Sequence, residues 1–234
     1  WRTDLVGCLV LGNLFSKVFK GEIQGESLGI DVDIFNEKNN SAKNGEKGEL
    51  VVKKPFPSMP VKFWDDPENK KYHKAYFSKY ENIWHHGDFI ERTSNNGFIM
   101  RGRSDATLNP GGVRIGTSEI YQQVEDLDYI TEALVVGQDF KDDVRIILFV
   151  TTKNDQDLGE EKIKSIKSKI RKNCSSKHVP SLIIKAPQIP RTKSGKIVEL
   201  AVRNMINGEK IMNIEAISNP ESLNFFQNLP QLKV

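Results

Sequence analysis

The hydrophobic pattern of the chain changes character near its middle. Over residues 1–104, apolar side chains alternate with polar ones in short runs, and Gly, Pro, Asn and Ser fill the segments between these runs. A period of two with turn residues between the runs predicts antiparallel strands joined by hairpins. The strands that we expect cover 29–35, 48–52, 84–90 and 97–101.

After residue 104, helical patterns alternate with short strands. Helices are predicted after Gly116, over 158–174 and after Lys196, where apolar residues recur every three or four positions. Runs rich in β-branched residues predict strands over 133–137, 145–151 and 182–186. This alternation predicts a small α+β domain, so the fold class is α+β, with a domain boundary at Ser104–Asp105.

The most apolar early stretch runs from Leu5 to Phe15. It is much shorter than the roughly 20 residues that a membrane-spanning helix needs, so we expect a buried strand and no membrane span. The chain begins without Met and without the features of a signal peptide, and we expect it to be cut from a longer chain. Cys8 and Cys174 have neither disulfide nor metal-site spacing, which favours a reducing compartment, the cytoplasm.

The net charge of the chain is small and says little about its partners. It carries 34 Lys and Arg against 31 Asp and Glu, a net charge of +3. So small an excess does not require a polyelectrolyte such as duplex DNA, and we expect no nucleic-acid partner. The densest basic cluster, Lys162–Lys177, contains isoleucines at helical spacing, which indicates a solvated helix face above a buried stripe.

Lys196 is the first candidate for a catalytic residue. It follows the polar, Gly-containing turn Arg191–Gly195 and precedes an apolar, helix-like stretch. Such a turn supplies backbone freedom, and a lysine beside it presents one compact positive charge to a polyanion. Taken alone, a Ser-Gly-Lys turn is more often a solvated surface loop.

Two upstream residues are suited to binding a nucleotide. Asp88 follows Gly87 after an expected strand, where a carboxylate can accept hydrogen bonds from the two hydroxyls of a ribose. Arg103 offers a planar group to phosphate or ribose oxygens. The plain alternatives are an Asp that caps its own turn and an Arg in a salt bridge at a domain edge. Gly111 and Gly112 form a loop free of side chains, which suits a narrow passage or a simple turn.

Several common catalytic centres lack their signatures. His85 and His86 are adjacent, so on a strand they face opposite sides, and no Cys or acidic cluster completes a metal site. The sequence contains no nucleophile elbow, no Walker-type loop and no dinucleotide-binding glycine pattern. Hydrolase, P-loop ATPase and dehydrogenase functions are therefore disfavoured.

Five motifs occur in order over about 150 residues: Gly48-Glu49-Leu50, Trp84-x-x-Gly87-Asp88, Gly102-Arg103-x-Asp105, Gly112-x-Arg114 and Thr192-Lys193-Ser194-Gly195-Lys196. Together they resemble the core motifs of the adenylate-forming superfamily, which includes acyl-CoA synthetases, peptide-synthetase adenylation domains and luciferases. The resemblance covers essentially the whole chain. It implies that 1–104 is the C-terminal part of an AMP-binding N-terminal domain, and that 105–234 is a small, mobile C-terminal domain with its hinge at Asp105.

The resemblance implies a two-step ligase, in which ATP and a carboxylic acid form an acyl-adenylate and pyrophosphate, and the thiol of CoA then displaces AMP. By position, Thr3 would contact the α-phosphate and Asp4 would hold Mg²⁺. Asp88 and Arg103 would bind the ribose and neighbouring oxygens, and Arg114 would meet phosphate.

The implied roles of the small domain differ between the two steps. Lys196 would bridge the incoming carboxylate and the α-phosphate during adenylation. Rotation at Asp105 would then withdraw Lys196 and bring Gly111 and Gly112 to the pantetheine channel. The implied substrates are ATP, CoA and a short acyl or keto acid. The implied partner is the missing part of the N-terminal domain, without which we expect this chain to be inactive.

Within the superfamily, segments such as Gly21–Gln24, Lys74–Lys79 and His178–Leu182 are most similar to acetoacetyl-type synthetases. This similarity implies the conversion of acetoacetate, ATP and CoA to acetoacetyl-CoA, AMP and pyrophosphate, and disfavours a luciferase or peptide-synthetase relative. Trp1, two positions before Thr3, is a feature of acetyl-type enzymes, so an acetyl or other short-chain substrate stays open. A non-catalytic adenylate-binding or interaction fragment is the alternative from another class.

Overall fold

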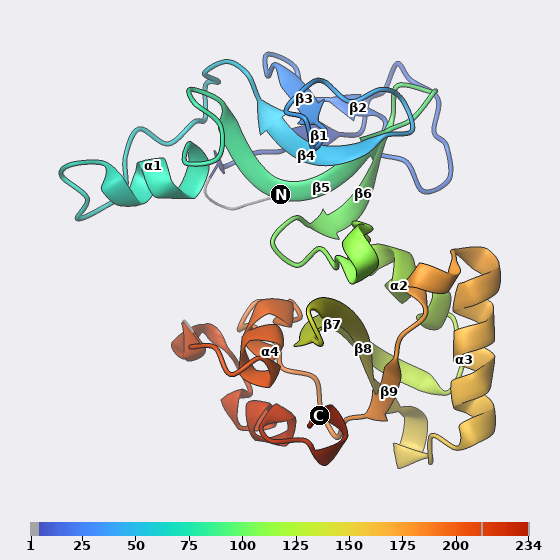
Figure 1. The fold of residues 1–234 in the computed structure, drawn as a ribbon. Helices are drawn as coiled ribbons and strands as arrows, with labels where there is room; N and C mark the ends of the chain where they lie inside the picture. The colour runs from blue at the N-terminus through green and yellow to red at the C-terminus, as the bar shows by residue number, and fades with distance from the viewer. Residues whose placement is uncertain (1–4, 212, 234) are drawn as a thin grey trace. The chain divides into compact units, whose positions relative to one another are not determined.

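The chain divides into two units, Trp1–Ser104 and Asp105–Val234, in a computed structural model that describes residues 5–211 and 213–233 (Figure 1). Strands and helices occur in both units, so the predicted α+β fold class is confirmed. The identities expected for the two units, an AMP-binding part and a mobile domain joined by a hinge, stay predictions. No helix in the described part of the chain is long and apolar enough to cross a membrane.

Unit 1, Trp1–Ser104, is built on a four-stranded antiparallel sheet whose strands follow one another in chain order. Its strands are β3 (Val32–Phe35), β4 (Lys47–Val52), β5 (Trp84–Arg92) and β6 (Phe98–Arg103). A small ribbon of β1 (Val10–Leu11) with β2 (Gly25–Glu26) and the helix α1 (Lys70–Tyr76) complete the unit. The four strands predicted from alternation all lie on this sheet.

The core of unit 1 lies between one face of the sheet and α1. Ile34 and Leu50 are Cα partners on β3 and β4, and both side chains are buried. Tyr76 of α1 stacks on Trp84 of β5, with ring centroids 3.7 Å apart and 12° between the planes. Because side chains on one face of adjacent strands pack against each other, the period of two in the sequence becomes one continuous apolar surface.

The prediction of one buried strand over Leu5–Phe15 is wrong. Only the two residues of β1 pair with another strand, and the side chains of Leu14 and Phe15 are 99% exposed. The side-chain oxygen of Asn13 accepts the Phe15 N–H at 2.9 Å, and the Asn13 N–H donates to Gln24 Oε1 at 3.0 Å. An Asn that bonds its own backbone forms a turn in competition with the strand ladder, and apolar content alone does not reveal this.

Unit 2, Asp105–Val234, contains a three-stranded sheet. Strand β7 (Ile130–Phe140) is antiparallel to β8 (Asp143–Thr152), and β9 (Leu182–Lys185) is parallel to β8. Its helices are α2 (Thr117–Val124), α3 (Glu160–Asn173) and α4 (Glu199–Ile206). Short 3₁₀ turns cover Pro110–Gly112, Lys153–Asp155, Ser176–His178, Ile214–Ala216, Pro220–Phe226 and Pro230–Leu232.

The sheet of unit 2 separates two cores. Val135 and Leu148 pack in a core that contains residues of α2 and α3, whereas Leu134 and Phe149 pack in a core with α4 and the C-terminal turns. Figure 1 shows α3 and α4 on opposite sides of this sheet. Since both faces are buried, β7 and β8 are continuous apolar runs rather than alternating ones.

The basic segment Lys162–Lys177 supplies most of helix α3. Ile166 and Ile170 are fully buried in the core beneath α2 and α3, while Lys164 and Lys172 are exposed. The interpretation of this cluster as a solvated helix face above an apolar stripe is confirmed.

Phe98→Ala should lower the free energy of unfolding by about 3–5 kcal/mol, because a fully buried ring leaves a cavity when it is removed. Phe98 is 0% exposed in the core of unit 1. Phe15→Ala in the same unit is the matched control, and should change stability by less than about 0.5 kcal/mol because that ring is already in solvent. Urea unfolding of both variants checks this expectation, and equal effects would contradict the burial assigned to the two rings.

Candidate functional site

Asp88 and Arg103 lie together at the end of the β5–β6 pair. Their Cα atoms are direct partners across the two strands, and Arg103 Nη1 is 3.2 Å from Asp88 Oδ1. The strand register shifts between Phe89 and Ile90, next to this pair. Such a bulge changes the direction in which the neighbouring side chains point. The Asp88 carboxylate, with a cation beside it, can therefore accept hydrogen bonds from a ligand while its charge stays paired.

His86 supports Asp88 from the interior of the unit. The Trp84 Nε1–H donates to His86 Nδ1 at 3.3 Å, and His86 Nε2 lies 3.4 Å from Asp88 Oδ2. Since an indole N–H can only donate, His86 Nδ1 must accept, and a neutral ring then carries its proton on Nε2, facing Asp88. Trp84, His86 and Asp88 stand two residues apart along β5, so they share one face of the strand.

A second buried carboxylate, Glu49, lies on the other face of this sheet, and sequence reasoning assigned it no role. It is 1% exposed and has three polar neighbours. Ser104 Oγ donates to it at 2.7 Å, Lys79 Nζ at 2.6 Å, and His85 Nε2 lies 3.0 Å away. His85 and His86 thus take different partners. In the sequence, only the motif Gly48-Glu49-Leu50 drew attention to Glu49, and it did not indicate the partners of this carboxylate.

The surroundings of Glu49 keep it ionised. Burial alone would raise the pKa of its carboxyl group, but the hydrogen bonds from His85, Lys79 and Ser104 outweigh burial and lower the pKa to about 2. Ser104 is the last residue of unit 1. The Glu49 cluster therefore fixes the end of unit 1 to its central sheet.

Lys196 stands at the end of a turn that the backbone closes twice. The Thr192 N–H donates to the Lys196 carbonyl at 2.8 Å, and the Gly195 N–H donates to the Thr192 carbonyl at 2.8 Å. Gly195 has φ +80°, which favours glycine there. The Arg191 side chain donates to the Gly195 carbonyl at 2.5 Å and to Glu132 at 2.7 Å. A braced turn thus carries Lys196, which is exposed.

Gly111, Gly112 and Arg114 share one loop of unit 2. Leu108 and Ile115 close its base with two backbone hydrogen bonds of 2.9 Å, and both side chains are buried. Gly111 and Gly112 have φ values of +56° and +76°, which L-residues with a side chain rarely adopt. The two glycines are exposed and Arg114 is half-buried.

Three predicted site residues remain, and the structure describes one of them, Asp105. Asp105 is the first residue of unit 2, and its carbonyl accepts a hydrogen bond from Arg203 at 2.9 Å. Thr3 and Asp4 lie outside the described residues. Among residues 5–211 and 213–233, no three His, Cys, Asp or Glu side chains gather as a metal site would require.

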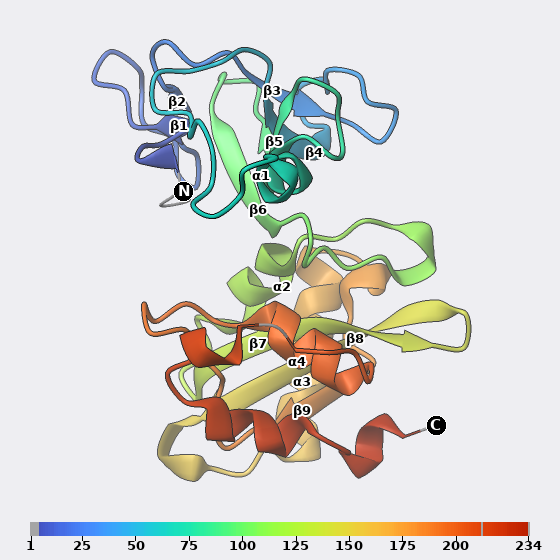
Figure 2. The same ribbon diagram turned by 90° about the vertical axis from the view of Figure 1, so that its left-hand side faces the viewer.

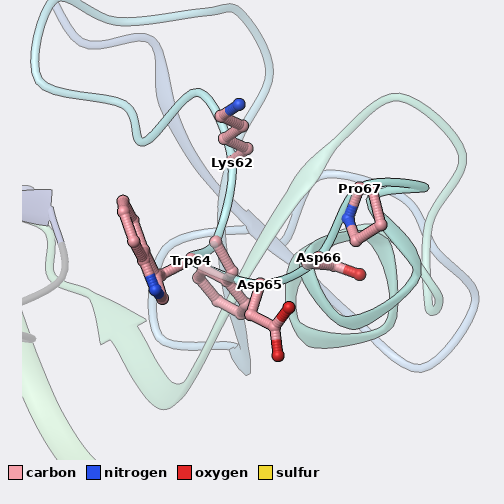
Figure 3. Close-up of a pocket in the computed structure, with 6 residues that line it drawn as sticks. Lys62, Trp64, Asp65, Asp66 and Pro67 are labelled. Carbon is pink, nitrogen blue, oxygen red and sulfur yellow. The ribbon is translucent and has the colours of Figure 1, made fainter.

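A hollow of about 360 Å³ in unit 1 is lined by residues 62–67, none of which was predicted as a site residue (Figure 3). The Trp64 side chain is 98% exposed, and Figure 3 shows its indole projecting away from Asp66 and Pro67. Asp66 is engaged elsewhere, since it accepts the Tyr72 N–H at 2.9 Å at the start of α1. The hollow is lined by Lys62, Asp65 and Asp66 as well as apolar side chains, but by none of the residues that the sequence motifs single out.

Comparison with known proteins gives a consistent result, although no protein-family model matches the chain. The chain is 54% identical to the acetoacetyl-coenzyme A synthetase of Rhizobium meliloti over 231 residues, which are 99% of this chain and 35% of the relative. Against the acetoacetyl-CoA synthetase of Xenopus tropicalis the identity is 44%, over 99% of this chain and 34% of the relative. The chain thus spans about a third of the length of the curated relatives it matches.

Solved structures agree with the sequence matches. An acetoacetyl-CoA synthetase from Streptomyces lividans matches with a TM-score of 0.90 and 37% identity, over 98% of this chain and 35% of that one. A benzoate CoA ligase from Burkholderia xenovorans LB400 matches with a TM-score of 0.67 and 25% identity, over 80% of this chain and 36% of that one.

Glu49→Gln should cost roughly 3 kcal/mol of stability at neutral pH, the free-energy equivalent of lowering a pKa from 4.5 to about 2. The contribution of Glu49 is fully present above the unfolded pKa of 4.5 and is lost as the pH falls towards the folded value of about 2. The stability difference between wild type and variant should therefore shrink by more than half by about pH 3.

Urea unfolding at several pH values measures this difference. Glu37→Gln, a change of the same kind at an exposed position, is the matched control and should leave stability unchanged at each pH. A difference between wild type and Glu49→Gln that does not vary with pH would show that the charge of Glu49 is not what stabilises unit 1.

Proposed function

Because the chain belongs to the adenylate-forming family of CoA ligases and corresponds to the C-terminal part of its members, we propose that it is part of an enzyme that joins acetoacetate to CoA, converting ATP to AMP and pyrophosphate. The extent of the similarity to acetoacetyl-CoA synthetases, which covers 99% of the chain, carries this proposal. Members of the family use ATP and CoA. The cytoplasmic location expected from the sequence remains a prediction.

The Asp88–Arg103 pair suits the nucleotide. In the proposal, the Asp88 carboxylate accepts hydrogen bonds from the ribose hydroxyls, and Arg103, 3.2 Å away, balances its charge and contacts neighbouring oxygens. His86 on the inner side of Asp88 leaves the ligand the outer lone pairs of the carboxylate. Arg114 meets phosphate, and Thr3 and Asp4 supply the α-phosphate contact and the Mg²⁺ ligand.

Lys196 supplies the charge for the first step. The acid oxygen attacks the α-phosphorus of ATP and pyrophosphate leaves, so negative charge develops on oxygens between the two substrates. An ammonium group at that point stabilises the transition state more than the ground state. The support for this role is the braced turn, which holds the backbone of Lys196 while its side chain extends into solvent.

The second step requires a different part of unit 2. Leu108 and Ile115, at the base of the Gly111–Gly112 loop, lie in the core beneath α2 and α3, whereas Ile189, ahead of the Lys196 turn, lies in the core beneath α4. The two loops are thus anchored on opposite faces of one sheet. A rigid unit that must present first one loop and then the other to the same adenylate has to turn as a whole.

Asp105 is the proposed hinge for this rotation. It is the first residue of unit 2, and the residue before it, Ser104, is held to Glu49 of unit 1. Torsion changes at Asp105 would move the loop and the lysine together, and neither core would need to be disturbed.

Exposed apolar side chains on unit 1 support its assignment to a larger domain. Of the twelve large hydrophobic side chains exposed among the described residues, nine lie in unit 1, including Leu14, Phe15, Leu28 and Trp64. Apolar side chains left exposed are a common feature of surfaces that another part of a protein covers. We propose that the part of the relatives not matched by this chain covers it, as the remainder of the AMP-binding domain.

Residues 1–234 alone should catalyse no ATP–pyrophosphate exchange with acetoacetate, because the groups that hold the triphosphate in line with the acid are expected upstream. A fusion of this chain to the upstream two thirds of the Rhizobium meliloti relative should restore exchange. Acetate in place of acetoacetate tests the acetyl-type alternative in the same assay. Exchange by the pure chain, or a correctly folded fusion without exchange, would contradict the proposal.

Lys196→Ala in the fusion should slow adenylation by about 10²–10³-fold, the usual effect of losing one group that stabilises transition-state charge. Thioester formation from supplied acetoacetyl-adenylate should be nearly unchanged, since Lys196 is needed only in the first step. Lys193→Ala, in the same exposed turn, is the matched control. Equal loss of both half-reactions on changing Lys196 would rule out a role confined to adenylation.

A further inference from the structure

The loop that carries Gly111 and Gly112 is fixed at its tip as well as at its base. The Gly111 N–H donates to both carboxylate oxygens of Asp143, at 2.8 Å and 3.0 Å. Asp143 is the first residue of β8, so it lies 32 positions along the chain from Gly111. Figure 2 shows the loop after β6 beside the turn that joins β7 to β8.

Charge strengthens this attachment. Hydrogen bonds from the backbone N–H groups of Gly111 and Val144, together with the positive charge of Lys177, lower the pKa of Asp143. Lys177 Nζ lies so close to Gly111 that a Cβ atom there would be 2.5 Å from it. A carboxylate that accepts from an amide makes a stronger bond than a neutral acceptor does. Asp143 and Lys177 thus both lie beside Gly111.

Gly112 differs from Gly111 in what surrounds it. No atom lies within 4 Å of the position that a Cβ of Gly112 would occupy. Gly112 also lines a hollow of about 630 Å³ at the β7–β8 turn, whereas Pro110 and Lys177 line another hollow, of about 250 Å³. In this loop, Gly111 is therefore held by neighbouring side chains, whereas the adjacent Gly112 has open space beside its Cα atom.

We propose that Asp143 is a positioning residue for thioester formation, which holds the Gly111 amide so that the open side of the loop at Gly112 faces the pantetheine arm of CoA. This inference rests on the role proposed above for the loop. Without Asp143, the base at Leu108 and Ile115 would remain, but the tip would sample other conformations. Only a fraction of molecules would then present the loop in the form that CoA requires.

The first test measures the loop in the chain of 234 residues. Solvent exchange of the Gly111 amide, followed by NMR, should be about tenfold faster in Asp143→Ala, as expected for the loss of a charge-assisted hydrogen bond. Asp143→Asn retains one acceptor oxygen and should give an intermediate rate. Asp142→Asn removes the neighbouring exposed charge and is the matched control. An unchanged Gly111 exchange rate in Asp143→Ala would overturn the inference.

The second test measures the two half-reactions in the fusion enzyme. Asp143→Ala should slow thioester formation by about tenfold and leave pyrophosphate exchange within about twofold of wild type, with Asp143→Asn in between. A merely structural role for Asp143 would lower both rates together, and that result would overturn the inference, as would unchanged thioester formation with a loosened loop. A wild-type fusion that forms no thioester would instead contradict the proposed function of the loop.

Discussion

The register of β7 against β8 is the constraint on which both loops of unit 2 depend. Val135 packs with the base of the Gly111–Gly112 loop, and its neighbour Leu134 packs with residues that flank the Lys196 turn. A slip of one residue would exchange the two faces and bury each set against the wrong partners. The ten Cα pairs that join these strands, and apolar burial on both faces, make such a slip costly. The positions of the two loops follow from that register.

Unit 1 shows how an antiparallel sheet accommodates buried charge. Glu49 and Asp88 are both nearly inaccessible, on opposite faces of the sheet, and each has cationic or hydrogen-bonding neighbours. Glu49 is enclosed by Lys79, His85 and Ser104 from its own unit, which suits a structural role. Asp88 has His86 Nε2 3.4 Å from one carboxylate oxygen and Arg103 Nη1 3.2 Å from the other, and a carboxylate can accept further hydrogen bonds from a ligand. Two similar carboxylates thus differ in role because of their neighbours.

The sequence predictions were correct for elements that a local pattern determines, and they failed where contacts between more distant residues decide the structure. The strands of both sheets and the basic helix α3 were predicted, since each carries its own period. The prediction of a buried strand over Leu5–Phe15 was wrong because the Asn13 side chain forms a turn with the Phe15 N–H, and the Asn13 N–H donates to Gln24, eleven positions away. Helix α1 was missed, although Tyr72 and Tyr76 are one helical turn apart, because seven residues make a weak pattern and its stacking on Trp84 is what stabilises it.

The sequence by itself determined the family of the chain, the identity of its charged candidates and the presence of two adjacent glycines in a loop, because short motifs and local periods lie in consecutive residues. Only the tertiary structure decided what those residues touch. Arg103 contacts Asp88 because their strands pair. Glu49 accepts a hydrogen bond from a serine 55 positions away, and the Gly111 amide donates to a carboxylate 32 positions away. Such contacts form only after chain folding has closed the loops between them, and no local pattern encodes that closure.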